Sequence, residues 1–158
     1  MRNLFYQVRG GVMNTILIQQ MNRQMNLEFY GAYLYYAMAS YFEKIFMEGF
    51  SLKLKKLATK RLSNAQKITD YLILRNEKLL FNKIDEPLSN WKYPSEVYNN
   101  LLNFEDFMLK NIYVLYGISE KNNDKGAIDF IYKLLIEQED LTNQVKKIQK
   151  QNSIAKGA

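Results

Sequence analysis

Two glutamates and an arginine occupy positions that the hydrophobic pattern otherwise assigns to a core. Glu28, Arg61 and Glu105 each fall near the middle of an apolar stripe with helical spacing, and Asn64 and Gln138 interrupt the same stripes. Burying an unpaired carboxylate costs several kcal/mol, so two of them in a helical core require a cation. That cation is either a bound metal or the guanidinium of Arg61, whose planar donors can serve two carboxylates.

The chain contains no histidine and no cysteine. Without them it lacks the commonest transition-metal ligand, the usual acid–base group at neutral pH, and any thiolate site or disulfide. Any chemistry must therefore come from carboxylates, amides, hydroxyls or lysines.

Four segments must position these polar residues, at about 13–44, 49–75, 95–120 and 127–150. In each, apolar residues recur at steps of three and four, which predicts helices with one buried face. The predicted inward faces are Glu28, Ala32, Tyr35, Ala39 and Phe42; then Phe50, Leu54, Leu57, Arg61, Asn64, Ile68 and Tyr71; then Tyr98, Leu101, Glu105, Met108, Ile112 and Leu115; then Ile131, Leu134, Gln138, Leu141, Val145 and Ile148.

The connections between these segments are short, long and short. Residues 77–93 include Pro87 and show no sustained period, so we expect them to cross a surface between two parallel helices. Ser95 follows Pro94 and is the expected cap of the third helix. No strand pattern competes. The sequence predicts an all-α four-helix bundle with one long crossover between the second and third helices.

The domain plan that we expect is a 1–12 extension, a 13–151 bundle and a 152–158 tail. Met13 is an alternative start to Met1. The longest uncharged stretch, 29–42, is too short to span a bilayer, and the N-terminus lacks the pattern of a secretory signal. We therefore expect a cytoplasmic protein that does not enter a membrane. The net charge of +6 favours anionic partners.

Several motifs together resemble the ferritin family, over about residues 20–148. The first is Asn26-Leu27-Glu28 with a tyrosine at Tyr35, seven residues after the glutamate. The others are Ala65-Gln66-Lys67 in the second helix, Trp91 placed 14 residues before Glu105, and the pair Glu137-Gln138. The gaps between Glu28, Arg61, Glu105 and Gln138 are 33, 44 and 33 residues, the register expected for bacterial-type, non-haem ferritins.

The resemblance implies a di-iron oxidation site from which this chain departs. Arg61 stands where the family has a bridging glutamate, Asn64 where it has a histidine ligand, and Lys60 where the third iron site has an acid. Of that third site Glu137 remains, Asp140 replaces a glutamate, and Leu141 replaces another. The vestigial metal positions are Glu28, Glu105, Glu137, Gln138 and Asp140, and Tyr35 matches the family's redox tyrosine.

We therefore expect no catalytic residues and no tightly bound cofactor, with iron at most a stored or weakly bound ion. An Arg61–carboxylate network is expected to close the di-iron site. Asn64 is expected to be a hydrogen-bonded amide in the core. The resemblance also implies a homo-oligomeric shell, most often a 24-mer in the family. We expect this chain to lack the short helix that follows the fourth helix in many ferritins, which makes the 24-mer less certain than the shell.

Three functions compete. The first is a shell related to intracellular iron storage whose iron oxidation is lost or very weak. The alternative is a cage or module with a basic interior that binds anions such as phosphate or nucleic acid, because the resemblance places Lys53, Lys56, Lys60 and Lys67 on the cavity wall. The last is an active oxidase with a rearranged site at Glu137 and Asp140.

Overall fold

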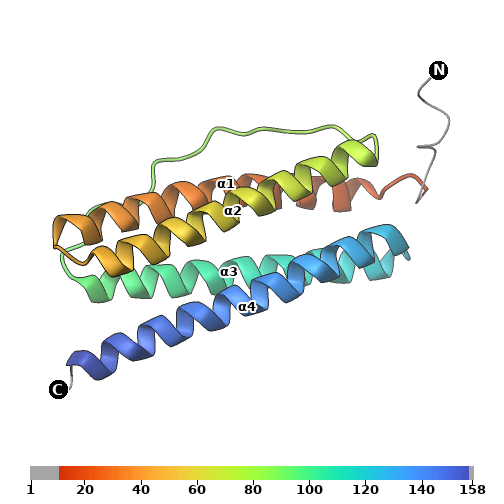
Figure 1. The fold of residues 1–158 in the computed structure, drawn as a ribbon. Helices are drawn as coiled ribbons and strands as arrows, with labels where there is room; N and C mark the ends of the chain where they lie inside the picture. The colour runs from red at the N-terminus through yellow and green to blue at the C-terminus, as the bar shows by residue number, and fades with distance from the viewer. Residues whose placement is uncertain (1–10, 157–158) are drawn as a thin grey trace.

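The computed structural model describes residues 11–156, with side chains for residues 11–151, and contains four long helices (Figure 1). They are α1 (Thr15–Lys44), α2 (Glu48–Leu74), α3 (Pro94–Lys121) and α4 (Lys125–Lys156). No strand occurs among the described residues. The predicted all-α bundle with a long crossover between the second and third helices is confirmed.

Local sequence explains where the helices begin. The side chain of Asn14 caps α1 by accepting hydrogen bonds from the backbone amides of Ile16 and Leu17, at 2.9 and 3.3 Å. The expectation that Ser95 caps α3 is wrong. Tyr93 is the cap residue and Pro94 opens the helix, because proline has no amide hydrogen to leave unpaired in the first turn.

The predicted inward faces agree with the buried residues except near three helix ends. Phe50, Tyr71 and Ile148, each in the first or last turns of its predicted helix, are only partly buried. The helix α4 continues to Lys156, past the predicted end near 150 and into the predicted tail. Residues 1–10, most of the predicted extension, lie outside the described part of the chain.

The crossover runs along the bundle beside α1 (Figure 1). Two asparagines of α1 hold its first residues in place. Asn22 donates to the carbonyl of Lys78 at 3.0 Å and accepts from the amide of Leu80 at 2.8 Å. Asn26 donates to the carbonyl of Leu80 at 2.7 Å and accepts from the amide of Asn82 at 2.9 Å. These side chains supply the partners that an extended segment outside a sheet otherwise lacks.

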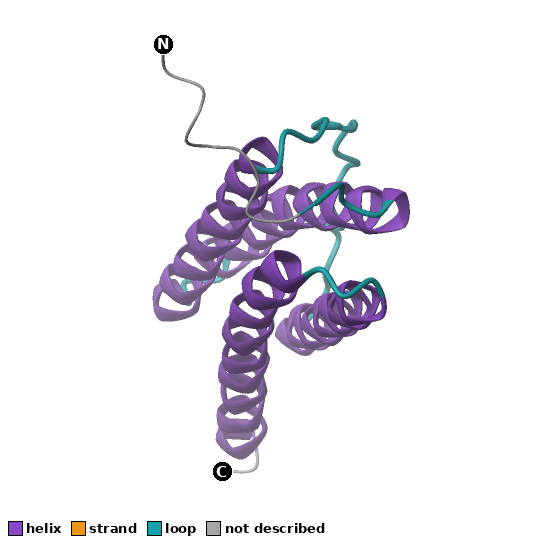
Figure 2. Ribbon diagram, turned by 90° about the vertical axis from the view of Figure 1, so that its right-hand side faces the viewer, coloured by secondary structure: helices purple, strands orange, loops and turns teal. Residues whose placement is uncertain are grey.

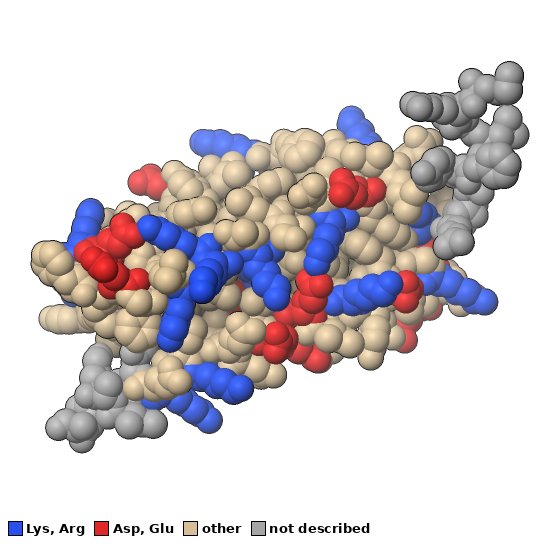
Figure 3. Space-filling view, in the orientation of Figure 1, with Lys and Arg blue, Asp and Glu red and all other residues tan. Residues whose placement is uncertain are grey.

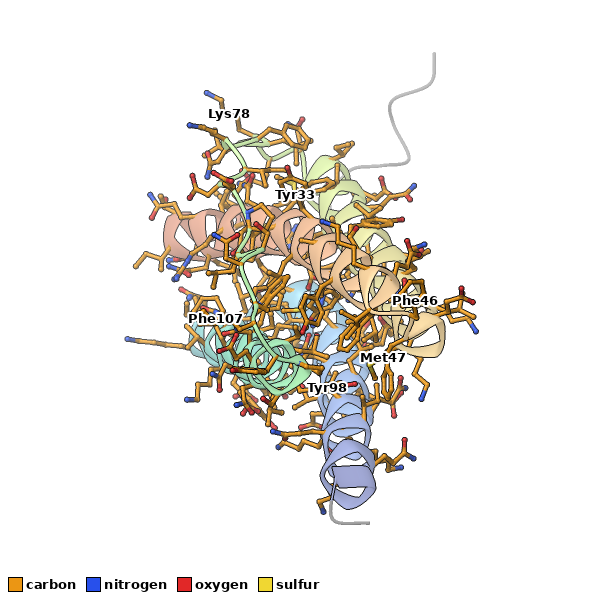
Figure 4. All side chains as sticks on the ribbon, turned by 90° about the vertical axis from the view of Figure 1, so that its left-hand side faces the viewer. Tyr33, Phe46, Met47, Lys78, Tyr98 and Phe107 are labelled. Carbon is orange, nitrogen blue, oxygen red and sulfur yellow. The ribbon has the colours of Figure 1, made fainter. Side chains whose placement is uncertain are left out.

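The helices pack most closely as the pairs α1–α2 and α3–α4, and Figure 2 views the bundle from one end. Side chains fill the space between them (Figure 4). Tyr98 is buried there, whereas Phe46, in the α1–α2 turn, projects into solvent with 91% of its surface exposed.

The apolar core has two parts. One cluster includes Phe42, Leu54 and Leu101 and lies toward the α1–α2 turn. The other includes Met21, Leu72 and Ile131 and lies toward the α3–α4 turn. The buried polar residues near the middle of the four helices lie between these clusters. The fold therefore holds a polar layer inside an otherwise apolar bundle.

In the described part of the chain, no helix is long and apolar enough to cross a membrane.

Candidate functional site

Each of the four helices contributes one central polar side chain to the middle of the bundle. These are Glu28 of α1, Arg61 of α2, Glu105 of α3 and Gln138 of α4, and each is at most 1% exposed. Their helical stripes turn them inward, so residues far apart in sequence meet at one level. The structure thus brings together four of the residues that the sequence singled out.

Arg61 is the centre of this network. Its Nη1 donates to Glu28 Oε2 at 3.0 Å and to Gln138 Oε1 at 2.8 Å. Its Nη2 donates to both carboxylate oxygens of Glu105, each at 2.6 Å. The two bonds to Glu105 are short, as expected where donor and acceptor are both charged. A single guanidinium therefore bridges carboxylates of two helices and an amide of a third.

Glu105 receives two further hydrogen bonds. The hydroxyl of Tyr35 donates to Glu105 Oε1, and Gln138 Nε2 donates to Glu105 Oε2 at 2.6 Å. Gln138 Nε2 also donates to Thr142 Oγ1 at 3.1 Å. Tyr35 matches the redox tyrosine of the family in sequence. In this structure its hydroxyl donates a hydrogen bond to the network.

Glu28 has fewer donors than Glu105. Apart from Arg61, its partner is Gln24 Nε2, which donates to Glu28 Oε1 at 3.1 Å. Close packing surrounds this side of the network. A Cβ added at Gly31 would lie 2.8 Å from the ring of Phe104 and 3.3 Å from Arg61 Cδ. Glycine at position 31 therefore leaves room for the arginine stem and the aromatic ring beside it.

Two causes shift the pKa values in the network: burial of every group, and the placement of one cation, Arg61, beside two carboxylates. Burial raises the pKa of Glu28 above its ordinary value, although Arg61 acts in the opposite direction. Burial favours the neutral form of Arg61, but Glu28, Tyr35 and Glu105 outweigh it and hold the pKa of Arg61 well above its usual range. Burial and the adjacent Glu105 raise the pKa of Tyr35 well above that of a free phenol. The guanidinium stays charged and the phenol stays protonated.

Three buried polar atoms in or beside the network lack hydrogen-bond partners among the described residues. They are the donor Arg61 Nε, the acceptor Gln24 Oε1, and the acceptor Asn64 Oδ1 one turn further along α2. Asn64 was expected to be a hydrogen-bonded amide in the core; its oxygen does not meet that expectation, because it has no partner in the part of the chain that the structure describes. Each such atom costs about 1–3 kcal/mol, so this corner of the core is not optimised for stability alone.

The other predicted site residues lie outside the network. Glu137 accepts two hydrogen bonds from Lys67 Nζ, at 2.8 and 3.0 Å, in a partly exposed ion pair between α4 and α2. Asp140 accepts a hydrogen bond from Gln144 on its own helix at 3.0 Å. Lys60 is exposed on α2. The structure does not bring Glu137 and Asp140 into the same cluster as Glu28 and Glu105.

The residues present do not fit a pair of iron ions. A permanently charged guanidinium lies within hydrogen-bond distance of both buried carboxylates, and no histidine exists to replace it as a ligand. Within residues 11–151, no group of three or more acidic, histidine or cysteine side chains could hold a metal. A metal ion entering this layer would meet strong repulsion from Arg61 at close range.

Sequence reasoning missed two members of the network, Gln24 and Thr142. Both are buried, at 1% exposure each. Both lie four residues from a residue that was identified, Gln24 from Glu28 and Thr142 from Gln138. One helical turn separates such residues, so a search for polar side chains at that spacing would have found them.

The sequence of the chain is similar to those of known proteins. Residues 18–153 match the family described as the ferritin-like domain. A bacterial non-heme ferritin from Bacteroides fragilis strain 638R is 31% identical over 117 residues, which are 74% of each chain. One from Staphylococcus haemolyticus is 32% identical over 122 residues, 77% of this chain and 74% of that one.

The fold is also similar to those of solved ferritin structures. An open pore ferritin from the hyperthermophilic archaeon Archaeoglobus fulgidus superposes with a TM-score of 0.87 at 26% identity, covering 90% of this chain and 87% of that one. A humanized archaeal ferritin gives a TM-score of 0.86 at 27% identity, covering 90% and 87%. Sequence and fold agree, and the chain belongs to the ferritin family.

Proposed function

We propose that this protein is a shell-forming ferritin-family subunit, related to iron storage, in which rapid iron oxidation has been lost. The observation that carries the proposal is Arg61, with its guanidinium hydrogen-bonded to both buried carboxylates. Arg61, Glu28 and Glu105 are then the remains of an iron site in which the arginine supplies the positive charge that the metal ions once supplied. Iron is a substrate or stored ion in this account, not a resident cofactor.

The rearranged oxidase is the weaker candidate. It needs Glu137 and Asp140 to bind iron together, but Lys67 already pairs with Glu137, and Asp140 bonds to a residue of its own helix. An ammonium group bound to a carboxylate opposes the entry of a divalent cation there as well.

The test is to restore the family's ligands with Arg61→Glu and Asn64→His. The initial rate of ferrous iron oxidation in air is measured per subunit for the native chain and for this double variant. We expect the native rate to match a protein-free control and the variant to exceed it by about tenfold or more, since the metal site recovers two ligands and loses a buried cation.

A matched control carries the same new side chains at a distance from the network, as Lys110→Glu with Asn103→His on the exposed surface of α3. It should oxidise iron no faster than the native chain. Fast oxidation by the native protein, or a folded double variant that stays inert, would refute the proposal.

Shell formation is measured separately, by sedimentation velocity of the purified native protein. We expect one closed particle much heavier than a single 18.7 kDa chain, with a 24-mer the family expectation. A monomer or dimer at all concentrations would refute the shell while leaving the result on iron oxidation intact.

A further inference from the structure

The N-terminal half of α2 carries a row of lysines that no acid neutralises. Lys53, Lys56 and Lys60 follow one another at helical spacings of three and four, and all three are exposed. No acidic residue occurs on α2 between Ser51 and Thr69. Among the described residues none of the three forms an ion pair, whereas Lys55 pairs with Glu43 and Lys67 with Glu137.

The neighbouring helix adds charge of the same sign. The pair Lys67–Glu137 joins α2 to α4, and the two helices run in opposite directions (Figure 1). The N-terminal half of α2 therefore lies at the same end of the bundle as the C-terminal half of α4. From Asp140 onward α4 has no further acid but carries exposed Lys147 and Lys150.

Figure 3 shows basic side chains gathered over this end of the α2–α4 face. We name Lys53, Lys56 and Lys60 of α2 the basic face. Like charges held close together repel one another and destabilise the compact state. Within residues 11–151, no acidic side chain pairs with Lys53, Lys56 or Lys60 to reduce this repulsion. A bound anion would remove that repulsion.

We propose that the basic face binds a linear chain of phosphates. The row from Lys53 to Lys60 extends about 10 Å along α2 at the helical rise of 1.5 Å per residue, so one extended polyanion can contact all three ammonium groups. A single phosphate reaches only one or two of them. Exposed Ser63 offers a hydroxyl donor at the next position of the row.

The same surface is poorly suited to nucleic acid. Single strands bind to grooves in which aromatic rings stack against the bases. The exposed residues of α2 between Lys53 and Lys67 are lysines, Thr59, Leu62, Ser63 and Gln66, and none is aromatic. Phosphate contacts are therefore available on this face without a platform for bases.

The test is isothermal titration of the purified full chain with inorganic tripolyphosphate and, separately, with orthophosphate. We expect tripolyphosphate to bind about tenfold or more tightly than orthophosphate, and its affinity to fall steeply between about 50 mM and about 200 mM salt. The variant Lys53→Gln/Lys56→Gln/Lys60→Gln should weaken tripolyphosphate binding by about tenfold or more. Glutamine keeps the helix propensity of lysine, so the fold should be unchanged.

The matched control is Lys83→Gln/Lys110→Gln/Lys121→Gln, which removes the same charge from exposed lysines on other surfaces. It should bind tripolyphosphate within about twofold of the native chain. Equal weakening in both variants would mean that only net charge matters and would overturn the proposal. Equal affinity for tripolyphosphate and orthophosphate would also overturn the proposal. So would a thymidine oligonucleotide that binds more tightly than tripolyphosphate and loses this binding in the Lys53→Gln/Lys56→Gln/Lys60→Gln variant.

This inference does not rest on the loss of iron oxidation. If the native chain both binds tripolyphosphate and oxidises iron rapidly, the phosphate-binding proposal stands and only the proposed function is refuted.

Discussion

A guanidinium at position 61 changes what the two buried glutamates do. Arg61 is fully buried, and its Nη atoms reach Glu28, Glu105 and Gln138 on three other helices. Removing one partner of a buried ion pair is far more costly than replacing the whole set, because it leaves an uncompensated charge. Removing Arg61 alone would therefore leave two buried carboxylates without their cation.

The change Arg61→Ala should lower the free energy of unfolding by about 4 kcal/mol near neutral pH. The loss should shrink toward about pH 5, and the sign follows from linkage. The folded-state pKa of Glu28 is already raised by burial and is held down by Arg61, so removing the arginine raises it further. The variant fold therefore takes up a proton more readily than the unfolded chain and gains stability as pH falls.

Urea unfolding at the two pH values measures this effect. The control Arg61→Met/Glu28→Gln/Glu105→Gln removes every charge together and should recover most of the loss. A loss for Arg61→Ala that is the same at both pH values would contradict the charge argument and point to packing instead.

At the scale of single residues, sequence identified the centre of the network but not its periphery. Glu28, Arg61, Glu105 and Gln138 stand out because each interrupts an apolar stripe. The hydrogen-bond geometry was not predictable, since it depends on the rotation and level of four helices. Asn64 Oδ1, which has no hydrogen-bond partner among the residues that the structure describes, illustrates this limit. Residue spacing shows that a side chain faces the core but not which atoms it contacts there.

The elements are held together at their ends by polar contacts that hydrophobic periodicity cannot show. Arg75, at the end of α2, donates two hydrogen bonds to Asp124 in the α3–α4 turn, both at 3.0 Å. Asp124 Oδ1 also caps α4 by accepting from the amide of Ala127 at 3.1 Å. Burial raises the pKa of Asp124, but the bonds from Arg75 and Ala127 outweigh it and lower the pKa below its usual value.

The change Asp124→Asn tests this contact. Because the folded-state pKa is lowered, the contribution of Asp124 is present above the unfolded pKa and is lost as pH falls through the folded one. The variant should be less stable by about 1–2 kcal/mol near neutral pH, with a smaller further loss in acid than the native chain. Asparagine keeps the cap, so Asp124→Ala should cost more still. Identical acid dependence of Asp124→Asn and the native chain, in unfolding followed by circular dichroism, would contradict the assignment.

The crossover depends on Asn22 and Asn26 for its first ordered residues. The double change to alanine should speed hydrogen exchange of the Leu80 and Asn82 amides by about tenfold or more, because both lose their acceptor. The exposed Asn143→Ala serves as control and should leave both amides unchanged. Unaltered exchange in the double variant would show that other contacts hold the crossover.

At the scale of elements, the four helices and their order were predictable because long amphipathic periods and a proline-containing connection are strong local signals. The Ser95 cap was not, since a proline at the first helical position and a serine cap are both compatible with the local sequence. The end of α4 was missed because its last two turns, to Lys156, carry too few apolar residues to sustain the period.

On the scale of the whole molecule, two features of the charge distribution both act against the binding of cations. In the core a guanidinium holds the carboxylates, and on the α2–α4 surface lysines outnumber acids. Both disfavour the approach of cations, and the second favours anions. The chain keeps the ferritin fold, and we expect these two features to oppose the binding of cations.

The most direct measurement is an iron anomalous difference map from crystals soaked anaerobically in ferrous iron. We expect no peak between Glu28 and Glu105, with Arg61 still hydrogen-bonded to both carboxylates. An iron peak bound by these carboxylates, with Arg61 displaced, would contradict it.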